Sequence, residues 1–148
     1  MKKITNIDRF LMCRTIAFVG ATPNKKLGNI FYINMKKKGF HVIPVNPNYQ
    51  QIENDICYPT ISQLPEKPEG VLIFTPKRVT ESIVDEAIKS GIHNIWIQLE
   101  SDTPCAVQKA KEANINLVYG KCIMMFSEPD GMHKFHRTIM KFFGRLPK

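Results

Sequence analysis

The stretch Thr15-Ile16-Ala17-Phe18-Val19-Gly20 decides the fold class of this 148-residue chain. It is a short, mostly apolar run that ends at a glycine, which is typical of a strand buried on both faces in a parallel sheet. A polar loop follows at residues 22–26, and residues 28–38 then have the pattern of a helix that ends in three lysines. The stretch therefore predicts the first strand–helix unit of an α/β domain.

The same alternation continues along the chain. We expect further strands at residues 41–45, 70–74, 94–99 and 116–119, and further helices at residues 79–90 and 103–113. Thr80 is the expected N-cap of the first of these two helices. The link between the second and third strands contains Pro59, Pro65 and Pro68, so only a short helical turn near Ser62 is expected there. With right-handed crossovers, this pattern predicts a doubly wound, parallel, five-stranded sheet.

The length fits a single domain, whose core we place at about residues 14–126. Residues 131–148 contain no acid but five basic residues, with phenylalanines at helical spacing. They predict an additional, basic amphipathic helix at about residues 131–145 that docks on the domain. His133 and His136 stand three residues apart there, but no third ligand is evident, so we expect no metal site.

The chain has 21 Lys and Arg against 13 Asp and Glu, a formal net charge of +8. Such a surplus suits an anionic partner: nucleic acid, an anionic membrane or a phosphorylated small molecule. No stretch approaches the roughly 18–20 apolar residues of a membrane helix, and charges interrupt the apolar region that a signal peptide would need. We therefore expect a cytoplasmic protein with no membrane partner. The four cysteines form no C-x-x-C pair, which argues against a zinc ribbon or a thioredoxin-type site.

Ligands of open α/β sheets bind beyond the carboxyl ends of the strands, so the residues after each strand form the candidate site. Basic residues lie on these loops, and none of the loops carries an acid before Glu100, which indicates a site for a polyphosphate. Gly20 lets a ligand approach the backbone, and the helix after it offers its N-terminal amides. The candidate binding residues are Gly20, Ala21, Thr22, Lys25, Lys26, Asn46, Pro47, Thr75, Pro76, Lys77, Arg78 and Gln98.

The common nucleotide-binding motifs are absent. Gly20 is next followed by Gly28, so there is no G-x-G-x-x-G, and the second strand ends in Asn46, where an NAD domain would place an acid. The P-loop motif is also missing. The third strand ends in Phe74 and Thr75 without the Asp of a phospho-receiver, so these three classes of protein are disfavoured.

Four motifs resemble the CoA-binding domain family, whose members are small bacterial proteins related to the nucleotide-binding domain of succinyl-CoA ligase α-subunits. The motifs are Val19-Gly20-Ala21-Thr22-Pro23, residues 39–47 ending in Pro-Val-Asn-Pro, Cys57-Tyr58-Pro59 and Ile95-Trp96-Ile97-Gln98. The resemblance covers residues 14–123. It implies a Rossmann-like sheet in the order 3-2-1-4-5 that binds coenzyme A through its nucleotide and pyrophosphate.

The resemblance also implies roles for individual residues. Gly20, Ala21 and Thr22 would approach the diphosphate, Asn46 and Pro47 would border the adenosine, and Thr75 and Pro76 would flank the cleft. Many relatives have a Phe-Arg-like pair where this chain has Phe-Thr-Pro, a departure for which Lys77 and Arg78 could compensate.

Several assignments stay open on the sequence alone. Lys25 and Lys26 fit a solvated loop as well as a phosphate contact, and Asn46 fits a turn before a proline. Gln98 fits a cap on backbone groups at a strand end. Cys122 is either a small buried hydrophobe or the partner of the CoA thiol in a mixed disulfide.

The sequence predicts non-catalytic binding of CoA or an acyl-CoA, since no histidine or carboxylate pair stands at the expected ligand edge. Whether the chain is also an enzyme stays open. The alternative is a nucleotide-dependent enzyme, either an NAD-type oxidoreductase or an acyl-CoA enzyme. Nucleic-acid binding through the C-terminal helix ranks last, because its phenylalanines are best explained by packing. A homo-oligomer is compatible with the sequence.

Overall fold

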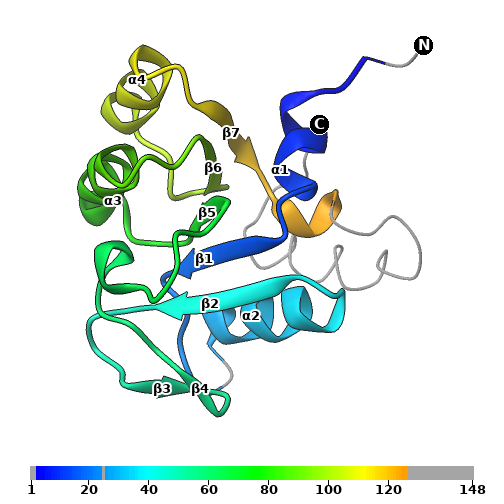
Figure 1. The fold of residues 1–148 in the computed structure, drawn as a ribbon, viewed down its shortest axis with the longest axis vertical. Helices are drawn as coiled ribbons and strands as arrows, with labels where there is room; N and C mark the ends of the chain where they lie inside the picture. The colour runs from blue at the N-terminus through cyan, green and yellow to red at the C-terminus, as the bar shows by residue number, and fades with distance from the viewer. Residues whose placement is uncertain (1–2, 25, 127–148) are drawn as a thin grey trace.

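The computed structural model describes residues 3–24 and 26–126 and contains a central parallel sheet with helices on both faces (Figure 1). The strands of this sheet are β1 (Thr15–Val19), β2 (His41–Val45), β5 (Gly70–Ile73), β6 (Asn94–Gln98) and β7 (Asn116–Lys121). The helices are α1 (Asn6–Leu11), α2 (Leu27–Lys37), α3 (Lys77–Lys89) and α4 (Pro104–Glu112). The predicted α/β class and five-stranded parallel sheet are confirmed. Lys25 and the predicted C-terminal helix lie outside the described residues.

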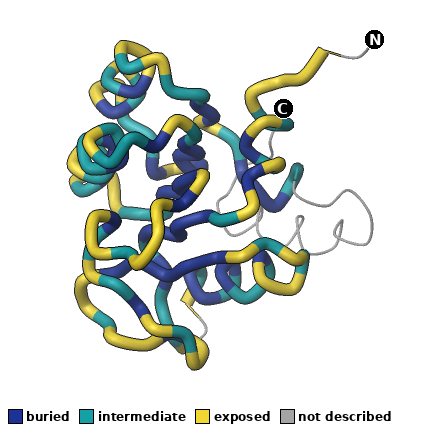
Figure 2. Tube along the Cα trace, viewed as in Figure 1, coloured by how far each residue is buried: buried dark blue, intermediate teal, exposed yellow. Residues whose placement is uncertain are grey.

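The two faces of the sheet have separate apolar cores, because successive side chains of a strand point to opposite faces. Ile16 and Phe18 of β1 pack with the side chains of α1 and α2. Ala17 and Val19 of the same strand pack with those of α3 and α4. Figure 2 shows the buried residues running through the strands, with exposed residues on the outer helices and loops. A sheet covered on both faces explains why the strand sequences are continuous apolar runs.

The strands lie in the order β2-β1-β5-β6-β7. Numbered along the chain within this sheet, the order is 2-1-3-4-5, so the order 3-2-1-4-5 is wrong. The position of β2 at the edge of the sheet has a physical reason. Pro44 has no N–H to donate to a further strand, and within sheets proline is confined to edge strands. Its carbonyl accepts a hydrogen bond from the loop residue Tyr58 (3.0 Å) on that open side. The third strand of the sheet, β5, pairs instead with the opposite edge of β1.

The link between β2 and β5 contains the expected short helical turn, at Ile61–Gln63, and a hairpin that the sequence analysis did not predict. The hairpin consists of β3 (Gln51–Ile52) and β4 (Asp55–Ile56). Its two turn residues both have positive φ, 49° and 68°, which is the geometry of a tight type I′ connection. The carboxylate of Asp55 accepts hydrogen bonds from Tyr32 and Lys36 of α2, so the hairpin is fixed against that helix.

Two further local expectations differ from the structure. Helix α1 was not predicted, although it begins at a capping box in which Thr5 and Asp8 bond each other's backbone N–H. Helix α3 begins at Lys77, two residues earlier than expected, so Thr80 is not an N-cap. The Thr80 side chain is instead fully buried in the first turns of the helix.

Helix α1 is held to the sheet chiefly by Phe10, which is fully buried and packs edge-on against Trp96 with ring centroids 5.6 Å apart. We expect Phe10→Ala to lower the free energy of unfolding by about 3–5 kcal/mol, because it removes a buried ring and leaves a cavity. Urea denaturation measures this change. The matched control is Met12→Ala, at a side chain that is 69% exposed, which should stay within about 0.5 kcal/mol of the unmodified protein. Equal effects of the two substitutions would contradict this account of α1.

Candidate functional site

A cleft lies beyond the carboxyl ends of β1, β2 and β5, where the chain turns from one half of the sheet to the other. It consists of two adjoining hollows, whose shared lining residues are Gly20, Asn46, Asn48, Thr75 and Pro76. The α2 hollow, about 460 Å³, is completed by Thr22, Lys26, Leu27, Gly28, Tyr49 and Phe74. The α3 hollow, about 410 Å³, is completed mainly by Pro47, Pro59, Arg78, Val79, Ile83 and Glu86. Both volumes are in the range of small-molecule sites.

Three strand ends converge on Gly20. Its N–H donates to the carbonyl of Val45 at the end of β2 (2.9 Å), and its φ is +102°. A Cβ at this position would lie 1.8 Å from the carbonyl oxygen of Phe74, which follows β5. Only glycine allows the loops after β1 and β5 to approach so closely.

A second glycine, Gly28, lets the first turn of α2 approach the same loop. A Cβ on Gly28 would lie 2.7 Å from the carbonyl oxygen of Gly20 and 3.0 Å from Oγ1 of Thr22. That Oγ1 is buried and has no hydrogen-bond partner among the described residues. A buried hydroxyl without a partner is costly, so this atom is available for a bound group in the α2 hollow.

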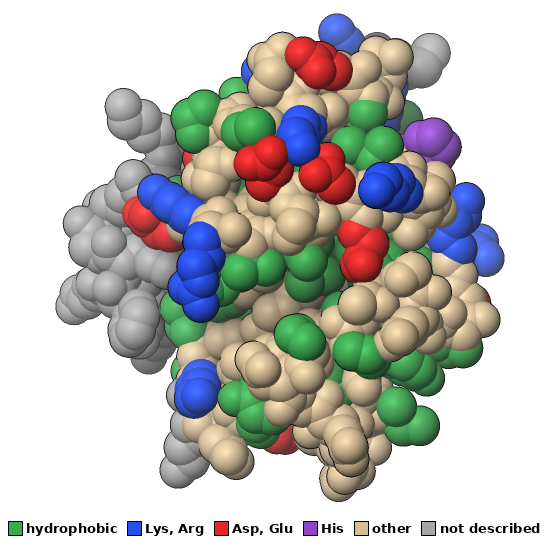
Figure 3. All heavy atoms as spheres, turned by 90° about the vertical axis from the view of Figure 1, so that its left-hand side faces the viewer, with side chains coloured by type: hydrophobic (Ala, Val, Ile, Leu, Met, Phe, Trp, Pro, Cys, Tyr) green, Lys and Arg blue, Asp and Glu red, His purple; other side chains and the backbone are tan. Residues whose placement is uncertain are grey.

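The N-termini of α2 and α3 both meet the cleft, and both are electropositive. The N-cap residues are Lys26 and Pro76; neither makes a side-chain capping hydrogen bond, and neither first turn contains an acid. Helix α3 has Lys77 and Arg78 in its first turn. Cations at the positive end of a helix dipole are unfavourable unless an anion offsets them. Figure 3, which views this face, shows basic side chains along one side of it, and the arrangement suits a phosphorylated ligand.

Asn46 joins the loops after β1 and β2. Its Nδ2 donates to the carbonyl of Ala21 and its Oδ1 accepts from the N–H of Asn48, each at 2.9 Å. The side chain is 9% exposed. Its hydrogen bonds thus fit the turn-forming alternative, and they fix the floor that the two hollows share.

Most of the predicted site residues come together in this cleft, three of the described ones do not, and one lies outside the described residues. The residues that line it are Gly20, Thr22, Lys26, Asn46, Pro47, Thr75, Pro76 and Arg78. Lys25 lies outside the described residues. Ala21 is buried beneath the loop and Lys77 is exposed, and neither lines a hollow. Gln98 is fully buried, where its Oε1 accepts from the N–H of Ile123 (3.0 Å), as a strand-end cap would.

Several residues that line the cleft were not predicted from the sequence. Asn48 and Tyr49 belong to the loop after Pro47, which carries no recognisable motif. Glu86 reaches the cleft from the C-terminal half of α3, where its carboxylate accepts from the N–H of Ile61 (2.8 Å). Gly28 alone had a usable signal, since a glycine at the start of a helix is unfavourable unless close packing requires it.

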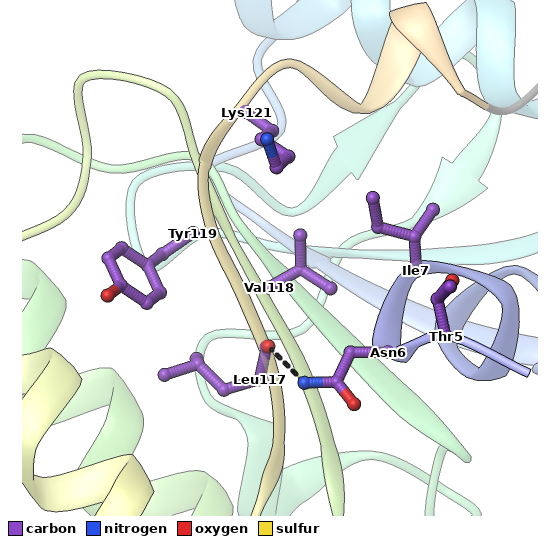
Figure 4. Close-up of a pocket in the computed structure, with 7 residues that line it drawn as sticks. All are labelled: Thr5, Asn6, Ile7, Leu117, Val118, Tyr119 and Lys121. Carbon is purple, nitrogen blue, oxygen red and sulfur yellow. Dashed lines mark hydrogen bonds between the residues drawn. The ribbon is translucent and has the colours of Figure 1, made fainter.

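Another hollow, about 510 Å³, lies away from this cleft, between α1 and the edge strand β7 (Figure 4). Figure 4 shows Val118 and Tyr119 pointing to opposite sides of β7, so the hollow is an open groove around the sheet edge. Nδ2 of Asn6 donates to the carbonyl of Leu117 there (3.3 Å) and covers part of the edge. Lys121 lines this groove and neither hollow of the cleft.

The Cys122 side chain is 1% exposed, and burial raises the pKa of its thiol. Both properties oppose thiol exchange, so the geometry fits the buried-hydrophobe alternative. Cys57 lies nearer the cleft, where its Sγ donates to the carbonyl of Asn46 (3.6 Å), and burial raises its pKa as well. Within the described residues, no group of His, Cys, Asp and Glu could hold a metal ion. No described helix is long and apolar enough to span a membrane.

Comparison with known proteins relates the chain to CoA-binding domains. The family model described as a CoA binding domain matches residues 14–128. An ADP-forming acetate–CoA ligase of Archaeoglobus fulgidus is 24% identical over 151 residues, covering 95% of this chain and 22% of the ligase. The chain spans less than a quarter of the length of the curated relatives that it matches.

Two solved structures of archaeal proteins share the fold along nearly their whole length. A hypothetical protein from Pyrococcus horikoshii is 32% identical with a TM-score of 0.77, covering 84% of this chain and 95% of that one. A conserved hypothetical protein from Pyrococcus furiosus is 34% identical with a TM-score of 0.72, covering 76% of this chain and 97% of that one. The likeness therefore extends to chains that consist almost entirely of this fold, as well as to a part of much longer ligases.

The close approach at Gly20 can be tested by comparing two glycines. Gly120 also has positive φ (+71°), but a Cβ there would meet nothing within 4 Å. We expect Gly120→Ala to lower the free energy of unfolding by about 1–2 kcal/mol, the cost of the left-handed backbone. Gly20→Ala should cost about 1–3 kcal/mol more, because the strand ends must also separate. Urea denaturation of both variants measures the difference, and equal losses would contradict the steric role of Gly20.

The burial of the thiols predicts their reactivity. All four cysteines are free, and Cys105 is the exposed one. We expect one thiol of the native protein to react rapidly with Ellman's reagent and all four to react after unfolding, because the buried thiols are inaccessible. Cys105→Ser should abolish the rapid reaction. Rapid labelling that survives this substitution and disappears in Cys122→Ser would show instead that Cys122 is accessible.

Proposed function

The chain belongs to the CoA-binding domain family, and we propose that it binds coenzyme A or an acyl-CoA in the cleft beyond β1, β2 and β5 without catalysis of its own. The observation that carries the proposal is the pair of uncapped, cation-bearing helix N-termini that meet at one cleft around Gly20. Coenzyme A carries about four negative charges on its phosphates, which would offset this positive potential.

The diphosphate fits the α2 hollow. Gly20 lines this hollow, Leu27 and Gly28 of the first turn of α2 line it too, and Lys26 stands at the N-cap. The unpartnered hydroxyl of Thr22 lies beside Gly28 at the same place. A phosphate oxygen there would accept from the amides and from this hydroxyl, which would satisfy the buried donor.

The adenosine fits the α3 hollow. Val79 and Ile83 of α3 and three prolines give this hollow apolar walls suited to the faces of a base. Arg78 lies at its exposed side in the first turn of α3. A guanidinium at that position suits the 3′-phosphate that distinguishes CoA from NAD and ADP.

The lining supports binding rather than catalysis. Among the described residues that line the two hollows, the one carboxylate is that of Glu86, and it is engaged by the backbone of Ile61. The lining includes no histidine. The ligase activity belongs to much longer relatives, of which this chain spans less than a quarter. The cytoplasmic location and a homo-oligomer stay predictions.

Calorimetric titration with CoA and NAD at matched salt tests the proposal. We expect CoA to bind more tightly than NAD, because the cleft offers cations to a third phosphate. The affinity should fall as ionic strength rises, since exposed Lys and Arg are screened. Binding of CoA no tighter than that of NAD would overturn the proposal, and an affinity for duplex DNA that resists physiological salt would favour the nucleic-acid alternative instead.

Two charge-removing variants of one helix locate the site. Arg78→Ala removes a cation at the N-terminus of α3, and Lys89→Ala removes one at its C-terminus, outside both hollows. We expect Arg78→Ala to weaken CoA binding roughly tenfold, as for the loss of a hydrogen bond to a charged group. Lys89→Ala should leave the dissociation constant nearly unchanged. Equal effects of both variants would indicate only a long-range effect of net charge.

A further inference from the structure

Three hydroxyl side chains meet at the back of the cleft. Thr75 follows β5, Thr80 lies in α3, and Ser101 follows β6. Thr75 lines both hollows, whereas Thr80 is fully buried and Ser101 is 5% exposed. They form a connected network: the N–H of Thr75 donates to Oγ of Ser101 (3.2 Å), and the two threonine hydroxyls lie 2.8 Å apart. The network fixes the one residue of the three that a ligand can reach.

The direction of the hydrogen bond between the two threonines follows from counting protons. Oγ1 of Thr80 lies 2.7 Å from the carbonyl oxygen of Ser101 and 3.3 Å from that of Pro76. A carbonyl can only accept, and a hydroxyl has a single proton to donate. The Thr80 proton is therefore committed to a carbonyl, so the bond between the two hydroxyls must use the proton of Thr75.

A hydroxyl whose proton is committed retains only its lone pairs for other partners. A phosphate oxygen has no proton to donate to it when ionised, and two acceptors that face each other repel. A neutral N–H or O–H group, by contrast, can donate to it. Thr75 thus differs from Thr22, whose unpartnered hydroxyl can donate to a phosphate.

We propose that the Thr75 hydroxyl acts in the cleft only as a hydrogen-bond acceptor, and that it selects a neutral N–H or O–H donor on the nucleoside of the ligand. This inference rests on the proposed binding of a nucleotide in the cleft. In coenzyme A the 3′-oxygen is phosphorylated, so the neutral donors of the nucleoside are the amino group of the base and the ribose 2′-hydroxyl. Thr80 and Ser101 are positioning residues that set the direction of the Thr75 bond.

Titrations with four small ligands test this assignment. ADP carries both donors together with a 3′-hydroxyl that coenzyme A lacks. IDP replaces the amino group by a carbonyl and adds an N–H at N1 of the base, 2′-deoxy-ADP lacks only the 2′-hydroxyl, and inorganic pyrophosphate has only the phosphates. We expect Thr75→Val to weaken ADP binding about threefold to tenfold, the usual range for one hydrogen bond, and to leave pyrophosphate binding unchanged. The preference of the unmodified protein for ADP over IDP or over 2′-deoxy-ADP should vanish in the variant, and whichever preference vanishes identifies the donor.

The controls separate a ligand contact from a structural effect. Thr75→Ser keeps the hydroxyl and should keep the preference. Thr15→Val makes the same change at the start of β1, at the opposite end of the strand from the cleft, and should alter no dissociation constant. Thr80→Val should reduce the preference, because it frees the Thr75 proton to point elsewhere, and Thr80→Ser should restore it.

The possible failures are distinguishable. Equal binding of all four ligands by Thr75→Val and the unmodified protein would overturn the inference alone. So would a loss of pyrophosphate affinity as large as the loss of ADP affinity, since Thr75 would then contact phosphate. Weak CoA binding together with an ADP preference that depends on Thr75 would overturn the proposed function and leave the inference standing. Binding of none of these ligands would overturn both.

Discussion

The approach of Phe74 to Gly20 is the contact on which the cleft depends. The carbonyl of Phe74 occupies the space where any other residue at position 20 would have its Cβ. That contact brings the end of β5 against the end of β1, while the N–H of Gly20 fixes the end of β2 through Val45. Because these strand ends are joined, the loops that follow them surround a single cleft. The side chain of Asn46 forms the floor of this cleft through its hydrogen bond to the carbonyl of Ala21. Adding a Cβ at position 20 would therefore displace the loops that form every wall of the site.

The strand order decides which loops become walls. Because β5 lies beside β1, the point at which the strand order reverses lies between these two strands. Thr75 and Pro76, which follow β5, therefore line the cleft together with Gly20. In the order 3-2-1-4-5 the loop after the third strand would have been separated from Gly20 by the whole width of β2. Pro44 makes the outer side of β2 a poor partner for a further full strand, because it removes one backbone donor from that side. The loop residue Tyr58 occupies that side through the two hydrogen bonds it makes.

The fold was predictable from the sequence where a local pattern carries the information. The apolar runs of β1, β2, β5 and β6 and the helical pattern that became α4 needed no tertiary knowledge. The hairpin at residues 51–56 was missed because it is fixed by contacts distant in sequence, such as Asp55 with Tyr32. Helix α1 was missed although its capping box is a local signal; its packing, through Phe10 on Trp96, is again a contact distant in sequence. The site was predictable to the same degree: strand-end residues were found, but Glu86 and Tyr49 reach the cleft from elements that no motif marks.

The chain lacks the G-x-G-x-x-G motif, yet two of its glycines make the close contacts for which that motif needs glycine. In that motif the glycines allow a tight turn, a close approach to phosphate and a close packing of helix on strand. Here Gly20 makes the turn and Gly28, eight residues later, makes the helix contact, since its Cβ would lie 2.7 Å from the carbonyl of Gly20. The longer loop between them also places Lys26 at the N-cap of α2. Lys26 thus adds a positive charge to the helix N-terminus beside the cleft. Part of the net charge of +8 therefore lies where an anionic ligand would bind.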